Sequence, residues 1–148
     1  MTSHSQYKVR LFFEVQGISL TKRNNLKRFI EKIFTREKRR LDSLNYIFCS
    51  DKTLLKINRD WLKHDFYTDI ITFELSQQPE STIGEIYISM DRVRENAKIH
   101  GVSLKSELHR VIFHGALHLC GHSDKTKADS LKMRSLEEKY LHLFHVEH

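Results

Sequence analysis

Four stretches of the chain have the apolar or alternating pattern that is typical of β-strands. They are KVRLFFEV at residues 8–15, LDSLNYIFCS at 41–50, TDIITFEL at 68–75 and IGEIYISM at 83–90. In the third stretch, every second residue from 71 to 75 is apolar and the residues between them are Thr and Glu. We therefore expect four strands, separated by segments of other character.

Apolar residues at spacings of three and four predict about five helices between and after these strands. Ser50 or Asp51 is a suitable N-cap for the second helix, Ser89 or Asp91 for the third, and Ser103 for the fourth. The first helix should carry a basic outer face, and its apolar positions are Leu26, Phe29, Ile30, Ile33 and Phe34. The apolar positions of the last helix are Met133, Leu136, Tyr140, Leu143 and Phe144.

The number and order of these elements favour the α+β class. A chain of 148 residues can bury a sizeable core without disulfides, so we expect one domain over residues 1–148. In it, a mixed sheet of about four strands would pack with about five helices. The pattern does not say which strands are neighbours.

The charge of the chain favours polyanionic partners such as RNA. There are 25 Lys and Arg against 19 Asp and Glu, a formal net charge of +6, and the sequence pI is about 9.4. A basic surface that serves only solubility has the same composition, so charge alone does not decide.

Two further features predict a cytoplasmic location. Cys49 and Cys120 lie far apart in apolar surroundings and form no C-x-x-C pair, which favours a reducing compartment. The segment MTSHSQYKVR has no apolar signal core, and no apolar run approaches the roughly 20 residues of a membrane span.

The segment HGALHLCGHSD at residues 114–124 carries the most specific chemistry. His114 and His118 are four apart, so on a helix their imidazoles face the same side and can share a metal ion. Gly121 can end the helix and reverse the chain, which would bring Asp124 to the same point. Three protein ligands would leave a fourth position for water, as in catalytic zinc sites. Without the glycine and aspartate, two such histidines are more often exposed to solvent or buried in a core.

Two neighbouring positions refine this hypothesis. Glu107 and Arg110 lie on the same helical face as His114 and can support the ligands from behind, or they belong to an ordinary solvated charge stripe. The spacing H-x-x-x-H-x-x-G-x-x-D predicts a metzincin-like zinc-binding helix and turn. Zinc proteases, however, need a glutamate directly after the first histidine, and Gly115 stands there. A peptidase is therefore a less favoured interpretation.

These residues resemble the YbeY family, bacterial metal-dependent endoribonucleases of ribosomal RNA maturation. The segment from His114 to Gly121 is similar to the family signature H-G-x-L-H-L-x-G, and SELHRVIFHG leads into it. TDIITF at 68–73 is similar to the family's T-D-V-L-S-F strand, and GEIYIS at 84–89 to its G-D-I-x-I-S strand. The match spans about residues 54–124 in the same order.

The chain departs from the family pattern at positions that matter for chemistry. Asp124 stands where the family has its third histidine; aspartate is also a zinc ligand. His122 is a rival third ligand, although the family register favours Asp124. Leu62 stands where the family has a basic residue. Lys63 or Arg59 would have to serve as the phosphate contact in its place.

The resemblance implies a single-strand-specific endoribonuclease that processes the 3′ end of small-subunit ribosomal RNA and acts in ribosome biogenesis. It implies one Zn²⁺ ion or another divalent transition metal, held by His114, His118 and Asp124, whose bound water attacks the phosphodiester. Ribosomal RNA and the small subunit or its proteins are the expected partners. The alternatives are a non-catalytic ribosome-assembly factor with a structural metal and, third, a metalloprotease whose base comes from outside the helix.

Overall fold

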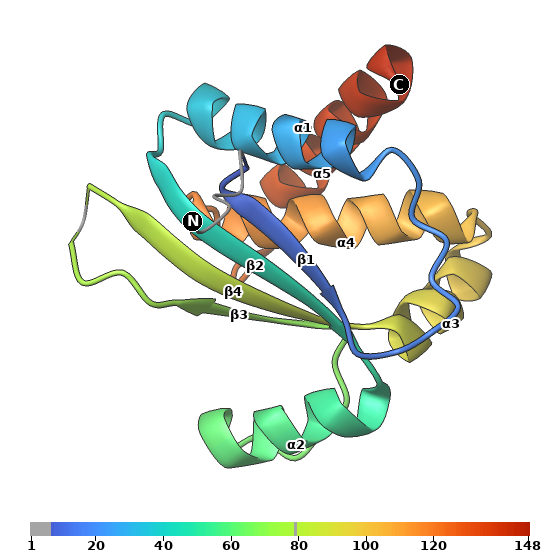
Figure 1. Cartoon of the computed structure of the whole chain (residues 1–148). Helices are drawn as coiled ribbons and strands as arrows, with labels where there is room; N and C mark the ends of the chain where they lie inside the picture. The colour runs from blue at the N-terminus through green and yellow to red at the C-terminus, as the bar shows by residue number, and fades with distance from the viewer. Residues whose placement is uncertain (1–6, 79) are drawn as a thin grey trace, which may run out of the picture.

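The computed structural model describes residues 7–78 and 80–148, so the first six residues of the segment examined for a signal lie outside it. In the described part, four strands and five helices confirm the α+β class (Figure 1). In chain order they are β1 (Val9–Phe13), α1 (Arg23–Arg36), β2 (Leu41–Cys49), α2 (Asp51–Leu62), β3 (Ile70–Glu74), β4 (Thr82–Ser89), α3 (Met90–His100), α4 (Leu104–Leu119) and α5 (Lys127–Glu147).

The strands form one mixed sheet in the order β1-β2-β4-β3. β1 and β2 are parallel, β2 and β4 are parallel, and β3 joins the other side of β4 in antiparallel orientation. The prediction of a mixed sheet is therefore confirmed, and the pairing that the sequence left open is settled. β3 lies at one edge of the sheet, so it pairs with a neighbouring strand, β4, on one side only.

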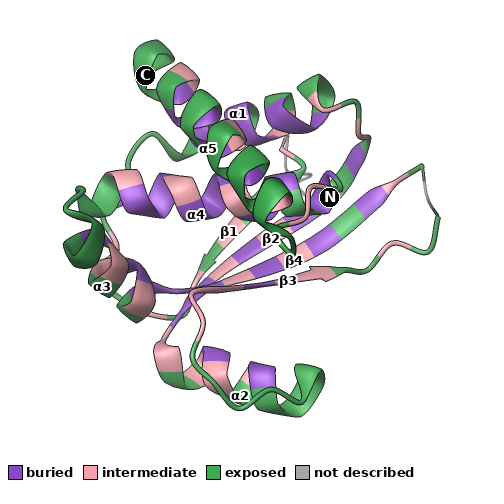
Figure 2. Ribbon diagram, turned by 180° about the vertical axis from the view of Figure 1, so that it is seen from behind, coloured by how far each residue is buried: buried purple, intermediate pink, exposed green. Residues whose placement is uncertain are grey.

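Helices cover the two faces of the sheet unequally. α1, α4 and α5 lie on one face, and α2 lies alone on the other (Figures 1 and 2). Alternation along β4 explains the division, because Ile86 and Ile88 belong to the main core while Tyr87 packs in a small cluster with Leu54 and Ile71 under α2. The exposed outer side of α2 and the buried character of α4 are visible in Figure 2.

The predicted capping residues begin three of the helices. The side-chain oxygens of Ser50, Ser89 and Ser103 accept hydrogen bonds from the backbone N–H groups of Thr53, Arg92 and Ser106, respectively. Of the two candidates for each helix, Ser50 rather than Asp51 caps α2, and Ser89 rather than Asp91 caps α3.

Gly115 allows α4 to lie directly on the sheet. A Cβ atom at this position would lie 2.8 Å from Ile86 Cδ1 and 3.0 Å from Ile70 Cδ1, closer than packed side chains tolerate. The approach is also stabilised by the hydroxyl of Tyr46, which donates to the carbonyl oxygen of Ile112 at 2.8 Å. The position that holds the catalytic glutamate in zinc proteases is thus filled by the sheet, which argues against a peptidase.

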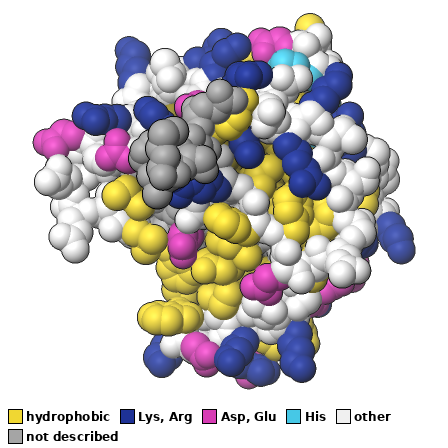
Figure 3. Space-filling view, viewed as in Figure 1, with side chains coloured by type: hydrophobic (Ala, Val, Ile, Leu, Met, Phe, Trp, Pro, Cys, Tyr) yellow, Lys and Arg dark blue, Asp and Glu magenta, His cyan; other side chains and the backbone are white. Residues whose placement is uncertain are grey.

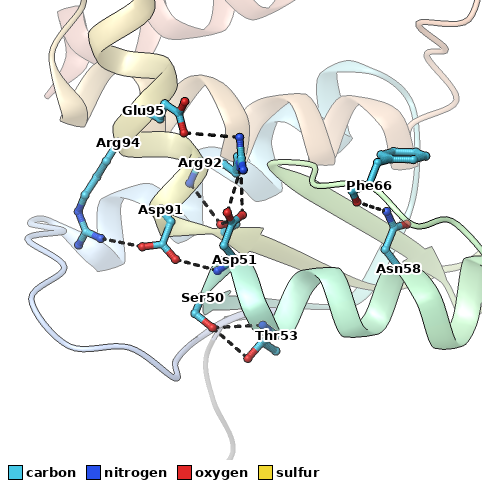
Figure 4. A network of polar contacts seen from close by, with 10 residues as sticks. Ser50, Asp51, Thr53, Asn58, Phe66, Asp91, Arg92, Arg94 and Glu95 are labelled. Atoms are coloured by element: carbon cyan, nitrogen blue, oxygen red, sulfur yellow. Dashed lines mark hydrogen bonds and ion pairs between the residues drawn. The ribbon is translucent and has the colours of Figure 1, made fainter.

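A polar network ties the N-terminus of α2 to that of α3 (Figure 4). The backbone N–H of Asp51 donates to Asp91 Oδ2 at 2.8 Å, and Arg92 Nε donates to both carboxylate oxygens of Asp51 at 3.1 Å. Ser89 Oγ also donates to Asp51, at 3.1 Å. Because this end of α2 is held firmly, the residues at its other end have a defined place relative to the sheet.

None of the helices in the described part of the chain is both long and apolar enough to cross a membrane.

Candidate functional site

A cavity of about 390 Å³ contains all three predicted metal ligands. Its walls are α4 from Arg110 onward, the turn after α4, strand β3, the end of α2 and the segment between α2 and β3. The residues that line it are Asn58, Leu62, His64, Phe66, Thr68, Asp69, Ile70, Ile71, Thr72, Arg110, Val111, His114, His118 and Asp124. The turn after α4 therefore does bring Asp124 back beside the histidines, as predicted.

The reversal depends on Gly121. Its φ of +99° lies in the region that favours glycine, and it directly follows Cys120, the C-cap of α4. A Cβ atom here would also lie 2.7 Å from Arg39 Nη2, so the glycine leaves room for the arginine. Arg39 Nη2 donates to the carbonyl oxygen of Cys120 at 3.2 Å and thereby holds the end of the helix.

His114 is oriented by a carboxylate from the last helix. Its Nδ1 lies 2.6 Å from Glu137 Oε2, while its Nε2 lies 3.6 Å from Asp124 Oδ2. A carboxylate at Nδ1 fixes that nitrogen as the protonated one and leaves Nε2, on the side of Asp124, as a lone-pair donor. This arrangement is common behind histidines that bind metals.

Glu137 belongs to a buried charged cluster. Arg110 donates to Glu107 Oε1 at 3.0 Å and to Oε2 at 2.6 Å, and its Nη1 donates to Glu137 Oε1 at 2.9 Å. Both carboxylate residues are only 2% exposed. The structure therefore places the predicted supporting pair Glu107 and Arg110 directly behind His114, and they are not a solvated charge stripe.

The hydrogen bonds and charges within the cluster shift the pKa values of its members. Burial alone would raise the pKa of Glu137, but hydrogen bonds from His114 and Arg110 outweigh it and lower the pKa. Burial would lower the pKa of His114, but the hydrogen bond to Glu137 and the nearby carboxylates of Asp124 and Asp69 raise it. The hydrogen bonds to Glu107 and Glu137 likewise raise the pKa of Arg110.

Sequence reasoning missed Glu137 and Asp69. Glu137 could have been noticed, because it interrupts the apolar face of α5 between Met133 and Tyr140, where a carboxylate is unusual. Asp69 lines the cavity within the TDIITF segment. Burial raises the pKa of Asp69, an effect that Arg110 and His114 partly offset. A carboxyl group with a raised pKa in a cavity is a typical feature of functional sites.

His118 and Asp124 are exposed side chains at the rim of the cavity. In the described residues, no three His, Cys, Asp or Glu side chains are already gathered in a geometry that would hold a metal ion. The cavity thus brings the three predicted ligands to one place, and His118 and Asp124 have the rotational freedom that closing around an ion would require.

His122, the rival third ligand, points elsewhere. Its Nε2 lies 2.7 Å from Glu37 Oε1, near the end of α1, and the hydroxyl of Tyr140 donates to the other oxygen of the same carboxylate. His122 is not among the residues that line the cavity. The structure therefore favours Asp124 over His122.

The two predicted phosphate contacts also lie outside the cavity lining. Arg59 pairs with Asp65, and Lys63 Nζ donates to the carbonyl oxygen of Asp60 at 3.3 Å. Leu62 lines the cavity instead. A different cation lies close by: Arg39 shares a second hollow, of about 260 Å³, with His118.

Basic side chains gather on two parts of the surface. Figure 3 shows Lys and Arg side chains gathered over α1 at the top of the view and over α2 at the bottom. Together with the formal net charge of +6, these side chains favour a polyanionic partner.

Comparison with known proteins gives one consistent picture. The family model described as "Endoribonuclease YbeY" matches residues 13–145. An endoribonuclease YbeY from Cytophaga hutchinsonii is 46% identical over 132 residues, which cover 89% of this chain and 92% of that protein. A second, from Flavobacterium psychrophilum, is 48% identical over 118 residues, which cover 80% of this chain and 84% of that protein.

The fold agrees with a solved structure as well. The solution structure of a Thermotoga maritima protein matches with a TM-score of 0.68 and 32% sequence identity, over 94% of this chain and 90% of the other.

Proposed function

The chain belongs to the endoribonuclease YbeY family, and from this premise we propose that it cleaves single-stranded RNA at a divalent metal ion bound by His114, His118 and Asp124. The observation that supports the proposal best is the position of these three side chains around one cavity, with His114 fixed by Glu137. Two imidazoles and a carboxylate suit zinc, and other divalent transition metals accept the same donors.

Each residue has a part that follows from its place. Glu137 holds the His114 ring, and Arg110 and Glu107 keep Glu137 charged and in position. When bound, the metal would polarise a phosphoryl oxygen and lower the pKa of a water toward neutrality. Asp69, which lines the same cavity with a raised pKa, is suited to accept or return a proton during cleavage.

The wider role follows from the family and from charge. We propose that the substrate is ribosomal RNA, at the 3′ end of the small-subunit RNA, and that the small subunit or its proteins are partners. A cytoplasmic location is part of the proposal, and the free thiols of Cys49 and Cys120 support it.

The test is cleavage of a short single-stranded RNA by purified, zinc-loaded protein and by its His118→Ala variant. Loss of a ligand removes several kcal/mol of transition-state stabilisation, so the rate should fall more than about a hundredfold. His142→Ala changes an exposed histidine of α5 away from the cavity and should cleave like the unmodified protein.

Equal cleavage by all three proteins would mean that a contaminating nuclease is at work. If none cleaves although RNA binds, the non-catalytic assembly factor becomes the better explanation.

A further inference from the structure

We propose that His64 and Phe66 form a subsite that stacks an unpaired nucleobase of the RNA beside the cleavage position. The inference rests on the proposed function, because it concerns the same cavity and the same substrate. Beyond the proposed function, it names the part of the RNA, an unpaired base, that these two side chains of the cavity would recognise.

The two rings form one aromatic surface. Their centroids are 5.1 Å apart and their planes differ by 20°, so they are stacked. Both rings line the cavity that holds His114, His118 and Asp124, and Phe66 is 55% exposed. An exposed aromatic pair beside a polar site offers the kind of surface on which proteins stack the bases of single strands.

The segment that carries the pair is held in place from below by Asn58. The backbone N–H of His64 donates to the carbonyl oxygen of Asn58 at 3.1 Å. Asn58 Nδ2 donates to the carbonyl oxygen of Phe66 at 2.8 Å, as Figure 4 shows. Asn58 itself is only 1% exposed. A buried residue that bonds both ends of a short segment, one through its backbone carbonyl and the other through its side-chain amide, keeps the rings in position before RNA arrives, so less ordering is needed on binding.

The neighbours of the pair suit a base better than a phosphate. Leu62, 38% exposed, lines the cavity where the family resemblance led us to expect a basic residue. Arg59 and Lys63, the nearest cations in sequence, are engaged outside the cavity lining. Leu62 shares the cavity with the two rings and offers an apolar surface to the face of a base, while Thr68 and Thr72 line the same cavity and can meet its edge.

The subsite would also explain a preference for single strands. A base inside a duplex is stacked on its neighbours on both faces and cannot enter a cavity, whereas an unpaired base can turn outward. A cavity of about 390 Å³ lies within the roughly 300–1,000 Å³ of small-ligand sites. The aromatic pair would thus select the substrate, and the ligands on the opposite wall would hold the ion.

The test compares RNA binding by the zinc-loaded protein and its Phe66→Ala and Trp61→Ala variants. The probes are a short single-stranded RNA and a series of the same RNA with one base removed at each position in turn. Trp61, 74% exposed and outside the cavity lining, is the matched control: it is an aromatic residue at the end of α2, five positions before Phe66. Thermal unfolding checks that each variant folds, as expected for changes at exposed side chains.

We expect Phe66→Ala to bind the intact RNA about tenfold more weakly, and Trp61→Ala to bind it normally. One abasic position should weaken binding to the unmodified protein by a similar factor and have no effect on Phe66→Ala, because the base and the ring act together. Phe66→Tyr, which keeps the ring, should restore both affinity and the abasic effect.

Equal affinity of Phe66→Ala and the unmodified protein would overturn the subsite, and so would a loss that is the same for intact and abasic RNA. Cleavage by the unmodified protein, measured in parallel, separates the two proposals. If it cleaves and Phe66→Ala behaves normally, only the subsite fails; if it neither binds nor cleaves RNA, both proposals fail.

Discussion

Glu137 is the residue on which the geometry of the site most depends. It contacts His114 and Arg110 at once, at 2.6 and 2.9 Å, although it is 23 residues from the first and 27 from the second. Its own pKa stays low because these two partners outweigh the effect of burial. It therefore acts as a positioning residue: it sets the direction of the His114 ring without touching the substrate.

Replacing Glu137 with Gln should weaken zinc binding about 10- to 100-fold, because support of this kind tunes a ligand to that extent. It should also lower the free energy of unfolding by about 1–3 kcal/mol, since buried hydrogen-bonding groups lose a charged partner. Competition with a zinc-binding dye and urea unfolding measure the two effects. Glu138→Gln, an exposed neighbour, is the control, and equal zinc affinity in both variants would exclude the positioning role.

Some of the site residues could be predicted from sequence motifs, and others could not. The spacing of His114, His118 and Gly121 predicted that Asp124 lies near the two histidines, because a helix places residues four apart on one face and a glycine permits the reversal. The choice between His122 and Asp124 needed the structure, since it depends on Glu37, which lies 85 residues from His122. Lys63 and Arg59 as phosphate contacts stay a prediction that the arrangement does not favour.

At the scale of elements, α4 joins the site to the core. One side of the helix packs on β3 and β4 through Gly115, and its adjoining positions present His114 and His118 to the cavity. The distance between the helix and the sheet therefore affects both stability and the placing of the ligands.

Gly115→Ala should push α4 away from Ile86 and lower the free energy of unfolding by about 1–3 kcal/mol, as overpacking does. Zinc affinity should fall with it, because the ligands move with the helix. Unfolding in urea and zinc titration measure the two. In the double variant with Ile86→Val, which removes the obstructing Cδ1 atom, the cost should be less than the sum of the single costs; strict additivity would contradict the close contact.

Periodicity predicted the elements well, and capping serines located three helix starts, because both signals are encoded in neighbouring residues. The order β1-β2-β4-β3 did not follow from them. The pairing of strands depends on contacts between segments that are distant in sequence, and local patterns carry no information about such contacts.

At the scale of the whole molecule, the main core and the candidate site are largely separate. The core is a continuous apolar cluster that includes side chains from β1, β2, β4, α1, α4 and α5. The cavity lies beside it, at the edge strand β3. Folding should therefore not depend on a metal, in contrast to small domains that are held together by zinc.

Removal of zinc with a chelator should abolish RNA cleavage and leave the far-ultraviolet circular dichroism spectrum unchanged. The loss of binding should cost about 2.7 kcal/mol of stability relative to zinc at a hundred times its dissociation constant. Thermal unfolding with and without chelator measures it. Loss of the folded spectrum on chelation would support the assembly factor with a structural metal.

The sequence by itself determined the helices and strands, their caps, the paired histidines and the turn at Gly121, because each depends on residues within a few positions of one another. The tertiary structure alone decided the sheet order, the placing of Asp124 rather than His122 in the cavity, and the groups behind His114. Glu137 reaches His114 across 23 residues and Arg39 reaches Cys120 across 81, and such contacts arise only from the packing of whole elements. The His64 and Phe66 pair is intermediate: its residues are two positions apart in sequence, but only folding places them in one cavity with His114 and His118.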